Sequence, residues 1–75
     1  MNLNDRTFLQ HLGDSLRDAR QAQQLTQEEL AEKCGLHRTF IGSVERGERN
    51  VSVLNLRVMA RVLRISLTDL FKKLA

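Results

Sequence analysis

Apolar residues recur every three or four positions along most of the chain, which is the spacing of one face of an α-helix. A first helix is predicted over residues 7–24, where one face carries Phe8, Leu12, Leu16 and Ala19. The same pattern predicts four further helices, over about residues 26–34, 37–46, 52–63 and 66–75. We therefore expect an all-α protein with five helices in a single domain spanning residues 1–75. Residues 1–6 are expected to form an N-terminal arm of this domain.

Residue types typical of helix ends support these boundaries. Thr26 precedes the second helix and is followed three residues later by Glu29, the arrangement of a capping box. Gly35 can adopt the positive φ that often ends a helix. Ser52 and Ser66 are good N-cap residues for the fourth and fifth helices.

Residues 27–46 have the layout of a helix-turn-helix motif. The fifth residue of this segment is Ala31, where the two helices cross closely and a larger side chain would push them apart. The ninth is Gly35, at the turn. Apolar side chains at the expected positions lock the two helices together: Leu30, Leu36, Ile41 and Val44.

The helical phase of residues 37–46 predicts which side chains are available for binding. If Ile41 and Val44 face the core, the opposite face carries Arg38, Thr39, Gly42, Ser43 and Arg46. A glycine within a helix costs about 1 kcal/mol relative to alanine, so an ordinary polar surface helix has little reason to contain one. We therefore favour insertion of this face into the major groove of DNA, where an arginine can bind guanine through two hydrogen bonds.

The charge distribution is compatible with this interpretation. Residues 36–64 contain six arginines and two glutamates, whereas residues 1–35 contain four basic and six acidic residues. A polyanion would meet the middle of the chain, although a solvated basic face is the plain alternative.

The chain has few residues suited to metal binding, redox chemistry or catalysis. Cys34 is the only cysteine, which indicates a reducing compartment, and His11 and His37 are too few for a zinc site. No apolar run approaches the length of a membrane span, and no nucleophile–base pair is apparent. We expect a cytoplasmic protein without enzymatic activity, cofactor, metal or small-molecule ligand.

Two segments, TQEELA (residues 26–31) and VERG (residues 44–47), resemble the DNA-binding domain shared by phage repressors and Cro, the XRE type of helix-turn-helix. The resemblance covers about residues 8–74 and implies the five-helix lambda-repressor-like fold. Within that family, RTFI (residues 38–41) together with the residue pairs 45–46 and 49–50 is most similar to controller proteins of restriction–modification systems.

The resemblance and the positions of polar residues together suggest a division of labour. Base reading is expected from Arg38, Thr39 and Ser43. Phosphate contacts are expected from the residues at helix starts and in the loop after the third helix: Thr26, Gln27, His37, Arg46, Arg49 and Asn50. His37 departs from the usual Ser, Thr or Asp, so a weak cap remains its alternative role, and Arg46 could instead read a base.

Two structural expectations accompany these site residues. The resembling family places an ion pair at Arg20 and Glu45, joining the first helix to the recognition helix. The fourth and fifth helices carry more apolar residues than one small core needs, so a dimer interface is expected there, with Leu67 and Leu74 as its candidates.

The predicted function is a sequence-specific transcriptional regulator that binds a palindromic operator on double-stranded DNA as a homodimer, in the manner of a restriction–modification controller protein. RNA polymerase is a further partner to consider, and activation and repression stay open. The alternatives are an antitoxin of a toxin–antitoxin pair and a protein-interaction module with a degenerate helix-turn-helix.

Overall fold

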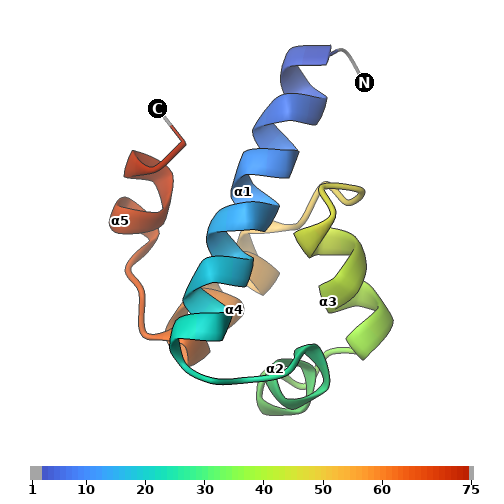
Figure 1. Cartoon of the computed structure of the whole chain (residues 1–75), viewed down its shortest axis with the longest axis vertical. Helices are drawn as coiled ribbons and strands as arrows, with labels where there is room; N and C mark the ends of the chain where they lie inside the picture. Colours follow the sequence, from blue (N-terminus) through green and yellow to red (C-terminus); the bar gives the residue numbers. More distant parts are fainter. Residues whose placement is uncertain (1–2, 75) are drawn as a thin grey trace.

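The computed structural model describes residues 3–74 and contains five α-helices joined by short connections (Figure 1). In chain order they are α1 (Leu3–Ala22), α2 (Gln27–Cys34), α3 (Arg38–Glu45), α4 (Val53–Leu63) and α5 (Leu67–Lys72). The expected all-α fold is confirmed, and the helix-turn-helix lies at α2 and α3.

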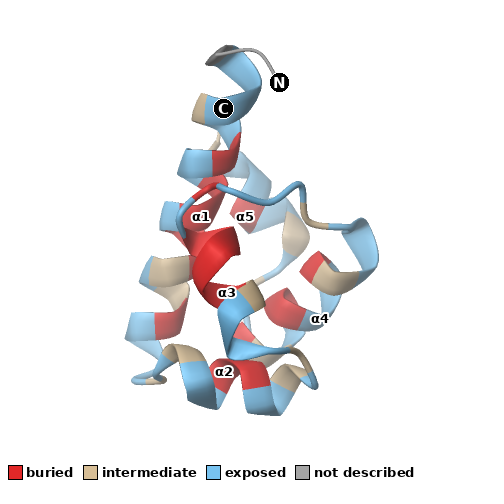
Figure 2. Cartoon of the chain, turned by 90° about the vertical axis from the view of Figure 1, so that its right-hand side faces the viewer, coloured by how far each residue is buried: buried red, intermediate tan, exposed pale blue. Residues whose placement is uncertain are grey.

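A single apolar core holds the helices together. The long helix α1 packs against α3, α4 and α5, and α2 packs against α3 and α4. Figure 2 shows the buried residues on the inward sides of the helices and concentrated in α3. Apolar residues from all five helices build this core: Leu9, Leu12, Leu16, Leu30, Ala31, Ile41, Val44, Leu56, Met59, Leu63 and Leu70. Within residues 3–74, no helix is both long and apolar enough to cross a membrane.

The predicted helix caps are confirmed. The Thr26 hydroxyl accepts a hydrogen bond from the backbone N–H of Glu29 (3.0 Å), and the Glu29 carboxylate accepts one from the N–H of Thr26 (2.9 Å). These backbone and side-chain hydrogen bonds from Thr26 lower the pKa of Glu29. Ser52 and Ser66 cap α4 and α5 in the same way, through their hydroxyls. Gly35 ends α2 with a φ of 67°, in the left-handed region.

The first helix differs from its predicted bounds. It begins at Leu3, so residues 3–6 form its first turn and the expected arm is wrong for them; Met1 and Asn2 lie outside the described residues. Residues 3–6 contain no glycine or proline, and Asp5 in the first turn interacts favourably with the positive end of the helix dipole. The helix ends at Ala22, and Gln24 adopts a φ of 58° in the following turn.

The two residues predicted for the dimer interface, Leu67 and Leu74, lie on and just after α5. Leu67 and Leu74 are half-buried and pack against the core, while Ala75 lies outside the described residues. On α4, in contrast, Val53 and Leu54 are each 70% exposed. Exposed apolar side chains therefore lie on α4, and Phe71 on α5 is exposed as well.

Candidate nucleic-acid interface

The helices α2 and α3 form a helix-turn-helix whose crossing is set by small and apolar residues. Ala31 on α2 is buried, as are Leu30, Ile41 and Val44, so the inward faces of both helices are closed. The turn between them passes through Gly35 and leaves the N-terminal end of α3 exposed. This geometry exposes Arg38 and Thr39 at the start of α3, while the rest of the helix is supported by α1 and α2.

A shallow notch of about 320 Å³ opens on the outer side of α3. It brings together two guanidinium groups, an amide and a hydroxyl around a residue without a side chain: Gln27, Arg38, Thr39, Gly42 and Arg46. Guanidinium and amide groups are the side chains that hydrogen-bond to base edges and phosphates. The notch is therefore a candidate DNA-contacting surface, and it gathers four of the predicted contact residues.

Gly42 makes room for the side chains that cross it. A Cβ atom at this position would lie 3.2 Å from Nη1 of Arg46 and 3.4 Å from Oε1 of Gln27. Gly42 is consequently buried, although the helical phase predicted that it faces away from the protein. The covering atoms are long polar side chains, whose reach an analysis of helical phase does not include.

Ser43, like Gly42, is buried although the helical phase predicted that it is exposed. It is 7% exposed, and its hydroxyl donates a hydrogen bond to the carbonyl oxygen of Phe40 (2.8 Å). The same hydroxyl accepts one from Nε of Arg49 (3.2 Å), whose guanidinium lies 5.5 Å from the centroid of the Phe40 ring. Ser43 is therefore buried and hydrogen-bonded within the protein, where an exposed side chain was expected.

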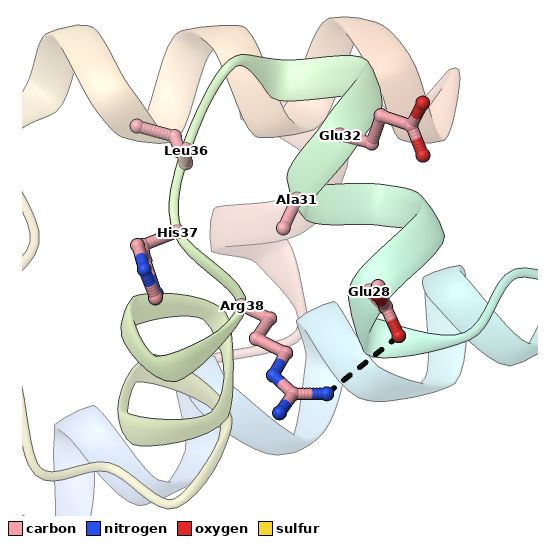
Figure 3. Close-up of a pocket in the computed structure, with 6 residues that line it drawn as sticks. All are labelled: Glu28, Ala31, Glu32, Leu36, His37 and Arg38. Atoms are coloured by element: carbon pink, nitrogen blue, oxygen red, sulfur yellow. Dashed lines mark ion pairs between the residues drawn. The ribbon is translucent and has the colours of Figure 1, made fainter.

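The exposed N-terminal end of α3 borders a second groove, of about 350 Å³ (Figure 3). Arg38 points across this groove toward Glu28 on α2, with 3.6 Å between Nη1 and Oε2. His37 is exposed at the start of α3 and its side chain makes no capping hydrogen bond. Of its two proposed roles, the structure therefore does not support a weak cap.

Arg46 follows the last turn of α3 and is paired with a carboxylate. Gly47 turns the chain back with a φ of 75°, which places Oε2 of Glu48 3.0 Å from Nε of Arg46. The hydrogen bond from Arg46 lowers the pKa of the Glu48 carboxyl. Asn50 lies apart from the notch, beside Phe8 and Leu9 of α1.

The predicted ion pair between α1 and α3 is confirmed. Arg20 donates from Nε to Oε2 of Glu45 (2.7 Å) and from Nη2 to Oε1 (3.0 Å), and the Glu45 side chain is 0% exposed. Arg20 also donates to the carbonyl oxygen of Leu25 (2.8 Å), which anchors the turn after α1.

Two further residues that no sequence pattern placed in this network complete it. Nε2 of Gln27 donates to Oε1 of Glu45 (3.0 Å), so the first residue of α2 is held to the end of α3. Arg17 lies 3.6 Å from the same carboxylate and donates to the backbone carbonyl of Glu45 (3.2 Å). Arg17 lies one helical turn before Arg20, and this spacing is the signal that could have revealed it.

Comparisons with known proteins agree with this geometry. A family model described as helix-turn-helix matches residues 16–70. The control protein C.SmaI of Serratia marcescens is 47% identical over 62 residues, which cover 83% of this chain and 74% of that protein.

Solved structures give the same result. The restriction–modification controller protein C.AhdI of Aeromonas hydrophila superposes with a TM-score of 0.81 at 46% identity, over 84% of this chain and 96% of that one. The controller protein C.Esp1396I, solved as a tetramer in complex with its natural 35 base-pair operator, superposes with a TM-score of 0.80 at 31% identity, over 89% of this chain and 88% of that one. The chain thus belongs to the helix-turn-helix family that includes the restriction–modification controller proteins.

Proposed function

We propose that this protein is a transcriptional regulator of a restriction–modification system that binds a palindromic operator as a homodimer. The observation that carries the proposal is the notch on α3, in which Arg38, Thr39 and Arg46 surround the bare backbone of Gly42. Its donors suit the acceptor-rich edges of bases and the oxygens of phosphates. The likeness to controller proteins over most of the chain supports the regulatory role.

In this proposal α3 enters the major groove with its N-terminal end leading. Arg38 reads a guanine through two hydrogen bonds and Thr39 contacts a neighbouring base. The free N–H groups at the start of α2, with Thr26 and Gln27, hold a phosphate. Bound next to a promoter, such a protein blocks or recruits RNA polymerase according to its position.

We assign the subunit interface to the outer face of α4. Three apolar residues follow one another there at spacings of four positions, Leu54, Val58 and Val62, and Ile65 comes just after the end of the helix. Leu54 and Val58 are exposed, and the other two are half-buried. A second copy with the same stripe would bury this surface, as a two-fold symmetric contact requires.

The variant Leu54→Glu should convert the dimer into a monomer. Leu54 is 70% exposed within one chain, so the substitution leaves the monomer core intact while it places a charge in the interface. Sedimentation equilibrium measures the association, with Gln21→Glu on the exposed end of α1 as the control for the added carboxylate. A Leu54→Glu protein that associates as tightly as the control would remove α4 from the interface.

Selection of bound duplexes from a random pool tests the proposed function as a whole. We expect enrichment of a two-fold symmetric sequence whose half-sites lie about 10–10.5 base pairs apart, with two chains bound per duplex. Recovery of sequences without any common element would contradict the proposal, and so would tight binding of a single chain to one half-site.

A further inference from the structure

Two arginines of the proposed DNA surface are paired with carboxylates. Arg38 is paired with Glu28 and Arg46 with Glu48, so carboxylates occupy both guanidinium groups that border the notch. Arg49 of the same surface forms no ion pair with another described residue, and neither do Arg57 and Arg61 on α4 nor Arg64 just after it. Both of these exposed pairs lie where DNA is proposed to bind, whereas the pairs of Arg17 and Arg20 hold α1 to α3 or lie within α1.

The pair between Arg46 and Glu48 is the closer of the two, at 3.0 Å against 3.6 Å. One edge of the guanidinium is held, because Nε donates to the carboxylate, while Nη1 lies near Gly42 at the rim of the notch. Both side chains are more than half exposed, so a ligand can reach them. A phosphate that binds Arg46 from the notch must therefore compete with the Glu48 carboxylate.

We propose that Glu48 is a built-in competitor of DNA phosphate for Arg46, and that it sets the affinity of each subunit for any duplex. The inference rests on the proposed function. Binding of a phosphate to Arg46 breaks the ion pair with Glu48 and leaves that carboxylate near the DNA backbone. The dimer then needs a higher concentration to occupy the operator than it would need without the Glu48 carboxylate.

The hydrogen bond from Arg46 lowers the pKa of the Glu48 carboxyl, as expected for a carboxylate that interacts with this guanidinium. Exposed ion pairs are weak, so the competition is expected to change the affinity by up to about fivefold per subunit. When Arg46 leaves Glu48 to bind a phosphate, the freed carboxylate remains negatively charged near the DNA. Fewer counterions are therefore released in total than when an unpaired arginine neutralises the phosphate. The slope of log affinity against log salt is therefore shallower than the number of phosphate contacts predicts.

A double-mutant cycle tests the proposal. The wild type, Glu48→Gln, Arg46→Gln and the double variant are titrated with the selected operator and with a scrambled duplex, over a series of salt concentrations. We expect Glu48→Gln to bind both duplexes more tightly, by up to about fivefold per subunit. Its salt dependence should be steeper, by up to about 0.9 per subunit. The gain should vanish in the Arg46→Gln background.

Glu32→Gln provides the matched control. Glu32 is exposed on α2, points away from Arg38 in Figure 3, and forms no ion pair within residues 3–74, so the variant makes the same change of charge without freeing an arginine. An equal gain from Glu32→Gln, or a gain that persists without Arg46, would show general repulsion and overturn the proposal. No gain from Glu48→Gln would overturn it too. In each of these cases, selection of a symmetric operator by the wild type would leave the proposed function standing.

Discussion

Glu45→Gln should lower the free energy of unfolding by about 3–5 kcal/mol, because it removes one partner of a buried ion pair and leaves the other charge without compensation. Arg20 would keep its hydrogen bond to the carbonyl of Leu25 and at most one to the neutral amide oxygen, and Arg17 would lose its second carboxylate. For a domain of this size such a loss corresponds to a fall in melting temperature of roughly 12 °C or more. Thermal and urea unfolding measure it directly.

The matched control is Asp14→Asn, which breaks the exposed ion pair between Asp14 and Arg17 on α1. This pair should contribute less than about 1 kcal/mol. Because the role assigned to Glu45 is structural, base preference among duplexes should stay the same in any Glu45→Gln protein that remains folded. Unchanged stability combined with altered base preference would show that Glu45 acts at the DNA instead.

Gly13→Ala should destabilise the protein even though alanine is the better helix former. A Cβ atom at Gly13 would lie 2.4 Å from the carbonyl oxygen of Glu45 and 2.6 Å from that of Val44, and neither is a flexible side-chain atom. The helices α1 and α3 would have to separate, which strains the core beside the buried ion pair. Overpacking of this kind costs about 1–3 kcal/mol, more than the gain of about 1 kcal/mol from helix propensity.

Gly42→Ala is the control, since it makes the same change in the middle of another helix. The nearest atoms there are the ends of the Arg46 and Gln27 side chains, which can move. We expect the stability of this variant to be unchanged or raised by up to about 1 kcal/mol. Chemical denaturation of the two variants compares them, and an equally stable Gly13→Ala protein would contradict the close approach of α1 to α3.

Local sequence signals predicted the four C-terminal helices well. The capping residues Thr26, Ser52 and Ser66 and the turn residue Gly35 act within a few positions of themselves, so their effect is visible in the sequence. The start of α1 was missed, because residues 3–6 lack a comparable signal and simply extend the helix.

The details of the candidate site depend on contacts between distant residues and were predicted less well. Ser43 and Gly42 are covered by Arg49, Arg46 and Gln27, whose long side chains reach over α3. The partnership of Arg20 and Glu45 was expected from the family resemblance, but the additional contact of Gln27 follows only from the crossing of α2 and α3. Helical periodicity identifies a face and does not show which neighbouring side chains cover it.

We propose that α3 reads bases through Arg38. The most direct test is to measure the affinity of the Arg38→Ala variant for the selected operator and for a scrambled duplex. Arg49→Ala is measured beside it as a comparison. Arg49 lies in the loop after α3, where a phosphate contact is proposed, so its removal should weaken both duplexes alike and reduce the salt slope by about one per subunit.

For Arg38→Ala we predict a loss of about 1–3 kcal/mol on the operator, a smaller loss on the scrambled duplex, and relaxed preference at one base pair of each half-site. An equal loss on both duplexes would contradict the account, because Arg38 would then contact the backbone and α3 would not read the operator through it.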